Sequence, residues 1–279
     1  MSIQFSPVIA AQTRGGGAFS VKVFDLDELG EPGSPVMVLD DFRVRGQPFP
    51  PHPHAGFSAV TYVFEDSQGS LRSRDSLGND VVVGPGGVVW TLAGSGVIHH
   101  EVPAQDDREL HGLQLFVNLS AKNKFAAPRM LRLAKNEVPE WRSEVGDRVR
   151  VVVGSFEGVA SSLAPVEPFD LLDIELRREV VFALTSGRRA IVYVVDGEFV
   201  VRADGAAQKV QGGTAIALRG EGQVKFEAVG PSHVVILSGA EIHEPVVSDG
   251  PFIMNDQSQI AAAGARYQAG QMGSLAPLA

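Results

Sequence analysis

The sequence contains no cysteine, and this absence limits how the chain can hold a metal. Without thiols there is neither a disulfide framework nor a thiolate metal site, so nitrogen and oxygen atoms must bind any transition metal. Long apolar runs are also absent, because none approaches the roughly 20 residues that cross a bilayer. The first residues, Met1 to Pro7, do not resemble a signal peptide. We therefore expect a cytoplasmic protein without a membrane partner.

The sequence also lacks an excess of positive charge. Its formal net charge is −9, with 24 Lys and Arg residues against 33 Asp and Glu residues. This balance disfavours non-specific attraction to nucleic acid or to anionic lipid. Arginine pairs such as Arg177-Arg178 are scattered among acidic residues and are typical of solvated faces. We expect no direct nucleic-acid partner.

Turn residues, by contrast, are spread along the whole chain. The 31 glycines and 17 prolines separate many short segments of strand-like sequence. These segments are 58–65, 69–75, 80–83, 88–92, 97–102 and 110–119, followed by 170–176, 180–184, 190–195, 198–203, 214–218, 223–228 and 233–237. Short strands without a long helical period predict an all-β barrel or sandwich.

Weak internal similarity indicates two copies of one β-barrel unit. Tyr62-Val63-Phe64-Glu65-Asp66 in the first half is similar to Tyr193-Val194-Val195-Asp196-Gly197 in the second. Between them, residues 121–140 are rich in Lys, Ala, Pro and Asn, which predicts a linker or crossing segment. The predicted domains are a metal-binding barrel (1–130), a linker (131–144), a barrel without metal (145–240) and a tail (241–279).

The tail contains a short helix in this prediction. Asp256 is a plausible N-cap and Gly270 a plausible stop for the helix-prone segment between them. Its apolar side, formed by Ile260, Ala263 and Tyr267, is expected to dock on a barrel.

Two short histidine segments predict a metal site. Side chains alternate between the two faces of an extended chain, so His52 and His54 share one face. By the same alternation His99 and Glu101 share a face, and His100 points away. Each pair alone is also compatible with ordinary surface histidines, but together they supply three imidazoles and one carboxylate. The predicted ligands are His52, His54, His99 and Glu101.

Other histidines are not expected to bind metal. His233 and His243 are isolated in the sequence, and we interpret each as structural. The second half has no His-x-His segment, because Arg188-Arg189-Ala190 precedes Tyr193.

Several motifs resemble the pirin family of the cupin superfamily, whose members are similar to quercetin 2,3-dioxygenases. They are Pro-His-Pro-His-Ala-Gly-Phe at 51–57, Arg-Asp-Ser-Leu-Gly-Asn at 74–79 and Ala-Gly-Ser-Gly-Val-Ile-His-His-Glu-Val-Pro at 93–103, with later motifs at 113–119 and 250–255. The resemblance covers nearly the whole chain. It implies two jelly-roll-like cupin barrels facing each other, with one metal in the N-terminal barrel on the four residues named above. Fe(II) is the metal it favours, and Mn, Co, Ni, Cu and Zn are alternatives.

Two positions depart from the family pattern. The family usually has Arg and an acidic residue where this chain has Ala55 and Ser58. The acid at the second position is often a ligand in the wider cupins, so here that task falls to Glu101. These two positions lie beside the predicted site, where charged side chains would influence the properties of the metal and the orientation of the substrate.

The resemblance implies two functions of different classes. The first is a dioxygenase that cleaves a flavonol such as quercetin, or another enediol, with O₂, with Glu101 as both ligand and base. The second is a non-catalytic regulator whose iron oxidation state changes its affinity for a protein partner. A structural metal in a binding protein is a third alternative. Small residues at Ala55-Gly56 and Gly94 to Gly96 are interpreted as the mouth of a pocket.

Overall fold

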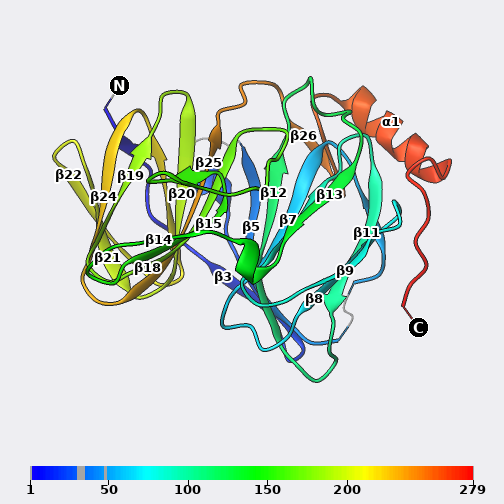
Figure 1. Ribbon diagram of the computed structural model, residues 1–279. Coiled ribbons are helices and arrows are strands. Elements are labelled where there is room, and N and C mark those ends of the chain that lie inside the picture. Colours follow the sequence, from blue (N-terminus) through cyan, green and yellow to red (C-terminus); the bar gives the residue numbers. More distant parts are fainter. Residues whose placement is uncertain (1, 30–34, 47–48, 279) are drawn as a thin grey trace. The chain divides into compact units, whose positions relative to one another are not determined.

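The computed structural model describes residues 2–29, 35–46 and 49–278, and the chain divides into two compact units. We call the unit of residues 13–21, 36–135 and 242–279 the first barrel. The unit of residues 1–12, 22–35 and 136–241 is called the second barrel. Strands dominate both units, and the described residues contain one α-helix, near the C-terminus (Figure 1). The predicted fold class is confirmed, whereas the boundaries at 130, 144 and 240 stay predictions.

The first barrel is built from two main sheets. The seven-stranded sheet has the order β13 (Arg129–Leu133), β10 (Val88–Leu92), β7 (Phe57–Val63), β12 (Leu110–Asn118), β5 (Val36–Val44), β4 (Phe19–Val23) and β3 (Gln12–Gly16). The four-stranded sheet has the order β6 (His52–His54), β11 (Val97–Pro103), β8 (Leu71–Asp75) and β9 (Asp80–Val83). β13 lies within the segment predicted to be a linker or crossing segment, and it pairs with β10.

Sequence patterns explain which strands are central. All residues of β7 are buried, and its sequence, Phe-Ser-Ala-Val-Thr-Tyr-Val, has no charge. β8, Leu-Arg-Ser-Arg-Asp, alternates between buried and half-buried positions. A near-continuous apolar run is typical of a strand covered on both faces, and alternation is typical of a strand covered on one. The cavity described below lies between the seven-stranded and four-stranded sheets.

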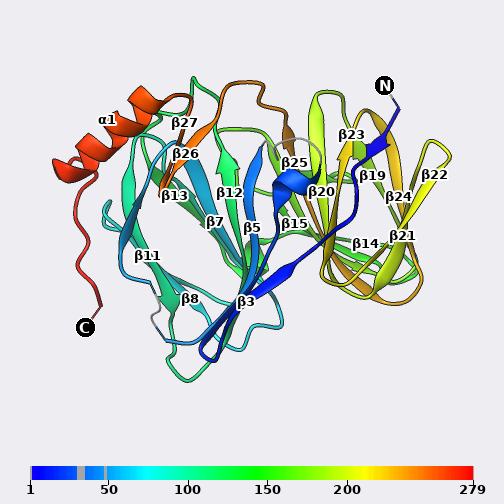
Figure 2. The same cartoon turned by 180° about the vertical axis from the view of Figure 1, so that it is seen from behind.

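The C-terminal segment folds onto the first barrel. It forms β26 (Val247–Asp249), β27 (Phe252–Met254) and helix α1 (Gln257–Gln268), which lie together in Figure 2. Asp256 caps α1 by accepting a hydrogen bond from the Gln259 amide at 2.9 Å, as predicted. Ile260 and Ala263 are buried, which confirms the docked face. Tyr267 is 42% exposed, so its predicted place on that face is wrong.

The second barrel also contains two main sheets. The eight-stranded sheet has the order β1 (Gln4–Phe5), β23 (Thr214–Arg219), β20 (Arg188–Asp196), β25 (Ser232–Ala240), β18 (Phe169–Leu176), β15 (Arg148–Val153) and β14 (Glu140–Arg142), with β2 (Ile9–Ala10) also paired to β23. The four-stranded sheet has the order β19 (Glu179–Leu184), β24 (Gly222–Ala228), β21 (Glu198–Ala203) and β22 (Ala206–Gln211). The remaining short elements are β16 (Ser155–Phe156), β17 (Val159–Ala160) and the 3₁₀ helices η1 (Leu26–Leu29) and η2 (Lys135–Glu137).

Apolar side chains fill the interior of the second barrel. In β19 the buried positions are Val180, Phe182 and Leu184, which alternate with exposed residues. They pack in one cluster with residues such as Phe199 and Phe226. His233 Nε2 lies 2.5 Å from Asp173 Oδ1, in agreement with its interpretation as a structural histidine. Within the part of the chain that the structure describes, no helix has the length and apolar character needed to span a membrane.

Candidate metal centre

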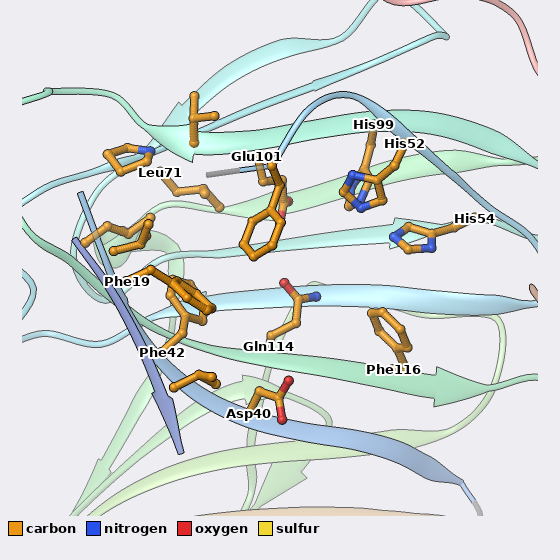
Figure 3. A pocket seen from close by; sticks show the side chains of 16 residues that line it. Phe19, Asp40, Phe42, His52, His54, Leu71, His99, Glu101, Gln114 and Phe116 are labelled. Carbon is orange, nitrogen blue, oxygen red and sulfur yellow. The ribbon is translucent and has the colours of Figure 1, made fainter. Parts of the chain in front are cut away.

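Strand pairing brings three histidines together. β6 and β11 are antiparallel, with His52 directly opposite His99 and His54 opposite Val97. Because His52 and His54 are two residues apart, their side chains share the face that His99 also occupies. One ligand nitrogen from each of the three lies within 4.8 Å of the others, and the ring centroids are 4.6–4.7 Å apart (Figure 3).

The spacing of these imidazoles fits a bound cation. His52 Nε2 and His99 Nε2 are 3.1 Å apart. Two nitrogens bound at right angles to one octahedral cation, each at about 2.1 Å, would be about 3.0 Å apart. His52 Nδ1 lies 3.0 Å from the Pro50 carbonyl oxygen, which orients the ring and leaves Nε2 for a metal. The His54 ring is held by edge contacts with Phe57 and Phe116.

The environment of His54 and His99 lowers their pKa values, which favours the uncharged form that binds a cation. Burial and the neighbouring His52 lower the pKa of His54 to about 3. Burial, with repulsion from His54 and His52, also holds the pKa of His99 well below its usual value. A neutral imidazole has a free lone pair, so both rings are in the metal-binding form at neutral pH.

Glu101 lines the same cavity but stands outside the three-histidine group. Among the described residues, the cluster of ligand atoms within 4.8 Å contains no carboxylate. Ser73 donates a hydrogen bond to Glu101 Oε1 at 3.0 Å, and Thr61 Oγ1 lies 2.5 Å from Oε2. Burial raises the pKa of Glu101, although these two hydrogen bonds oppose the shift. The structure places Glu101 beside the histidines, and its role as a ligand stays a prediction.

Thr61 links Glu101 to Gln114. Thr61 Oγ1 also lies 3.0 Å from Gln114 Oε1, and a hydroxyl has one proton to donate. Gln114 Nε2 donates to the Val60 carbonyl, which orients the amide so that its oxygen accepts from Thr61. Thr61 Oγ1 is thus shared between the acceptors Glu101 Oε2 and Gln114 Oε1. Together with Ser73, this network fixes the Glu101 carboxyl group beside the histidines.

His100 occupies the opposite face of β11. Its ring is buried, and its Nε2 lies 3.0 Å from the Phe49 carbonyl oxygen. It does not line the cavity that His99 and Glu101 line. The phase predicted from strand alternation is therefore correct for all three residues.

A cavity of about 230 Å³ extends from the three histidines between the two sheets of the first barrel. Most of its walls are apolar, and Figure 3 shows Phe19, Phe42 and Phe116 around it. Two polar side chains in the wall, Asp40 and Gln114, were not among the predicted site residues. Each directly follows apolar residues of its strand, but both strands also contain other polar residues, so the signal in the sequence is weak. Their arrangement on one face depends on pairing between strands that are distant in the sequence.

The glycines near the histidines serve a different purpose from the one predicted. Gly56 has φ +85°, and a Cβ there would lie 1.9 Å from the Ile253 carbonyl oxygen. A Cβ on Gly96, where φ is +133°, would lie 2.7 Å from the Met272 side chain. Neither glycine lines the cavity. The interpretation of this region as a pocket mouth is wrong, because these glycines admit the C-terminal segment.

Ala55 and Ser58, the two departures from the family pattern, also lie away from the cavity lining. Ala55 is fully buried and packs with Phe252 and Met254. Ser58 is buried as well, and its Oγ has no hydrogen-bond partner among the described residues.

Lys124 fixes the loop that follows His54. Its buried ammonium group donates to the carbonyl oxygens of Gly56 and Ile253, each at 2.9 Å, and to Asn118 Oδ1. Burial lowers the pKa of this lysine to about 8. Sequence reasoning did not single out Lys124, because its acceptors come from three separate segments.

Comparisons with known proteins agree with this architecture. A family described as pirin matches residues 11–117, and the pirin C-terminal cupin domain matches residues 171–273. A Pseudomonas aeruginosa protein provisionally named a quercetin 2,3-dioxygenase is 34% identical over 248 residues, covering 85% of this chain and 86% of its own. Human pirin is 34% identical over 236 residues, covering 82% of this chain and 79% of its own.

Solved structures are similar over most of the chain. Quercetin 2,3-dioxygenase from Acinetobacter baumannii has a TM-score of 0.85 and 26% identity, covering 99% of this chain and 100% of its own. A bacterial pirin from Escherichia coli in complex with nickel(II) has a TM-score of 0.66 and 21% identity, covering 86% of this chain and 100% of its own. The second likeness concerns the fold alone.

Proposed function

This chain belongs to the pirin family, and we propose that it is a mononuclear metal-dependent dioxygenase that cleaves a flavonol such as quercetin with O₂. The observation that carries the proposal is the cavity beside the three histidines, of about 230 Å³. One water occupies about 30 Å³ in the liquid, so the cavity has room for an organic molecule. The quercetin dioxygenase names of two similar proteins support the substrate class.

His52, His54 and His99 would hold the metal, with Glu101 as the fourth ligand. Fe(II) is the metal that we propose, and Mn, Co, Ni, Cu and Zn are the alternatives for the same donors. When bound, the metal would supply a Lewis acid that lowers the pKa of a coordinated substrate hydroxyl, and a route for electrons to O₂.

Glu101 is the proposed base. Beside a divalent cation its pKa would fall, which offsets the rise that burial causes. The carboxylate then receives the proton of the substrate hydroxyl. Ser73 and Thr61 hold the two carboxylate oxygens in place during this transfer. Apolar walls such as Leu71 and Phe116 limit the access of competing water.

Metal analysis followed by oxygen uptake tests this proposal. The purified chain is loaded with each candidate metal and supplied with a panel of flavonols and other enediols. We expect O₂ consumption and bleaching of quercetin with at least one metal. No turnover across the panel by fully loaded protein, together with capture of a protein partner that depends on the metal's oxidation state, would favour the regulator instead. A regulator needs only a metal that solvent reaches and has no need of a substrate cavity.

A further inference from the structure

A row of polar side chains crosses one wall of the apolar cavity. Gln114 on β12 is the register partner of Asp40 on β5 and of Thr61 on β7. The three therefore lie side by side on adjacent strands, and Thr61 contacts Glu101 from the other sheet. Two strand spacings of about 4.8 Å place Asp40 roughly 10 Å from Thr61. Figure 3 shows Gln114 between Asp40 and Glu101.

Asp40 is the unpartnered member of this row. Its carboxylate is half-buried and lines the cavity. No side chain or backbone group among the described residues forms a hydrogen bond or ion pair with it. Burial raises the pKa of Asp40 to about 6, and attraction to Arg14 opposes the shift. A carboxylate in this position destabilises the fold unless a partner arrives, and such local costs are found at ligand sites.

The walls near Asp40 suit a flat aromatic molecule. Phe42 is two residues along the same strand and also lines the cavity. Phe19 and Phe49 meet edge to face, with ring centroids 5.2 Å apart. Aromatic side chains favour offset or edge contacts with a ligand ring. The cavity thus offers a polar acceptor on the seven-stranded sheet, the histidines on the four-stranded sheet and apolar surface beside them.

We propose that Asp40 accepts a hydrogen bond from a phenolic hydroxyl at the end of the flavonol remote from the chelating hydroxyl. Asp40 is then a specificity-determining residue that selects polyhydroxylated flavonols over 3-hydroxyflavone, which carries the chelating group alone. This inference rests on the proposed function, because the chelating end defines which end is remote.

Equilibrium binding without O₂ tests the inference separately from turnover. The full chain is loaded with Ni(II), and quercetin and 3-hydroxyflavone are titrated against the wild type, Asp40→Ala, Asp40→Asn and Val44→Ala. Val44 lies on the same strand and lines the cavity without a polar group. Circular dichroism and metal content establish that each variant is folded and loaded.

Loss of a hydrogen bond to a charged acceptor is expected to weaken quercetin binding to Asp40→Ala by about 10- to 100-fold. Binding of 3-hydroxyflavone should change by less than about twofold, since no second hydroxyl is present to lose a partner. Asp40→Asn keeps an acceptor without the charge, so its loss for quercetin should be intermediate. Val44→Ala should weaken both ligands by a similar factor.

Two results would overturn the inference while leaving the proposed function intact. One is an equal loss for both flavonols in Asp40→Ala, which would mean that Asp40 acts through the fold. The other is unchanged quercetin binding in both Asp40 variants. Failure of the loaded wild type to bind either flavonol would instead refute the proposed function itself.

Discussion

At the scale of single residues, the adjacent histidines His99 and His100 on β11 have different roles. His99 is in the three-histidine group, whereas His100 is bonded to the Phe49 carbonyl on the other face. We expect His99→Ala and His52→Ala to lose nearly all bound metal. His100→Ala and His233→Ala should keep near-native content, measured by elemental analysis of the purified, folded proteins. An empty site in His100→Ala beside a full one in His99→Ala would contradict the assignment.

Glu101 provides a second test at this scale. If it is the base, Glu101→Gln keeps the shape of the side chain but removes its ability to take a proton. We expect quercetin turnover to fall by about 100-fold or more, the usual range for a general base. Metal affinity should fall much less, because the three imidazoles remain. Equal losses in metal content and turnover would show that Glu101 acts through metal retention alone.

Asp40→Asn should stabilise the metal-free protein at high pH. Folded Asp40 keeps its proton up to about pH 6, whereas the unfolded chain releases it near the usual value of 3.8. The folded state therefore binds more protons in this window, and stability is lost as pH rises through it. The shift corresponds to at most about 3 kcal/mol, and partial exposure reduces it to about 1–2 kcal/mol.

Urea unfolding at pH 8 and pH 4 measures this difference. Asp40→Asn is expected to be more stable than the wild type at pH 8 and nearly equal at pH 4. The same gain at both values would mean that the carboxylate charge is not the cause. A stabilising change that weakens quercetin binding would also mark Asp40 as a residue that trades stability for function.

At the scale of elements, the C-terminal segment supports the strands that carry the histidines. Ser76, at the end of β8, donates to the Met272 carbonyl, and Met272 packs against Gly96 just before β11. Gly96→Ala forces a side chain into a positive-φ position and against Met272. We expect a loss of about 1–3 kcal/mol in the free energy of unfolding.

A matched glycine in α1 separates this effect from a general response to alanine. Gly264 is in the helix interior, and an added Cβ there would meet nothing within 4 Å. Gly264→Ala should therefore stabilise the protein by about 0.5–1 kcal/mol. Both changes are read from chemical denaturation. Similar effects of the two substitutions would contradict the packing account of Gly96.

The features that could be predicted from the sequence are those that depend on local periodicity and local capping. Alternation placed His99 and Glu101 on one face, and capping chemistry placed the start of α1 after Asp256. Contacts between distant segments had no such local signal. Gly96 lies against Met272 only when the C-terminal segment docks. Asp40 becomes the register partner of Gln114 only when β5 and β12 pair. Without knowledge of these contacts, the small residues at Gly56 and Gly96 predict a pocket mouth instead of a docking site for the C-terminal segment.

At the scale of the whole molecule, the two cupin barrels have diverged in their interiors. The first contains titratable groups around a cavity, and the second is filled by residues such as Phe182, Phe199 and Phe226. By its place in the sheet order β19 corresponds to β6, and it has Val180, Phe182 and Leu184 as its buried residues where β6 has histidines. The two halves therefore share their pattern of strands but not the residues that line the cavity of the first barrel.

Isotope labelling shows whether the first barrel catalyses the reaction of a flavonol with O₂. Metal-loaded protein is given quercetin under ¹⁸O₂, with His99→Ala as the control that lacks a ligand. We expect the wild type to consume quercetin and both atoms of the labelled O₂ to appear in the organic products, while His99→Ala is inactive. No consumption above that control by fully loaded wild type, or label recovered only as water or hydrogen peroxide, would contradict it.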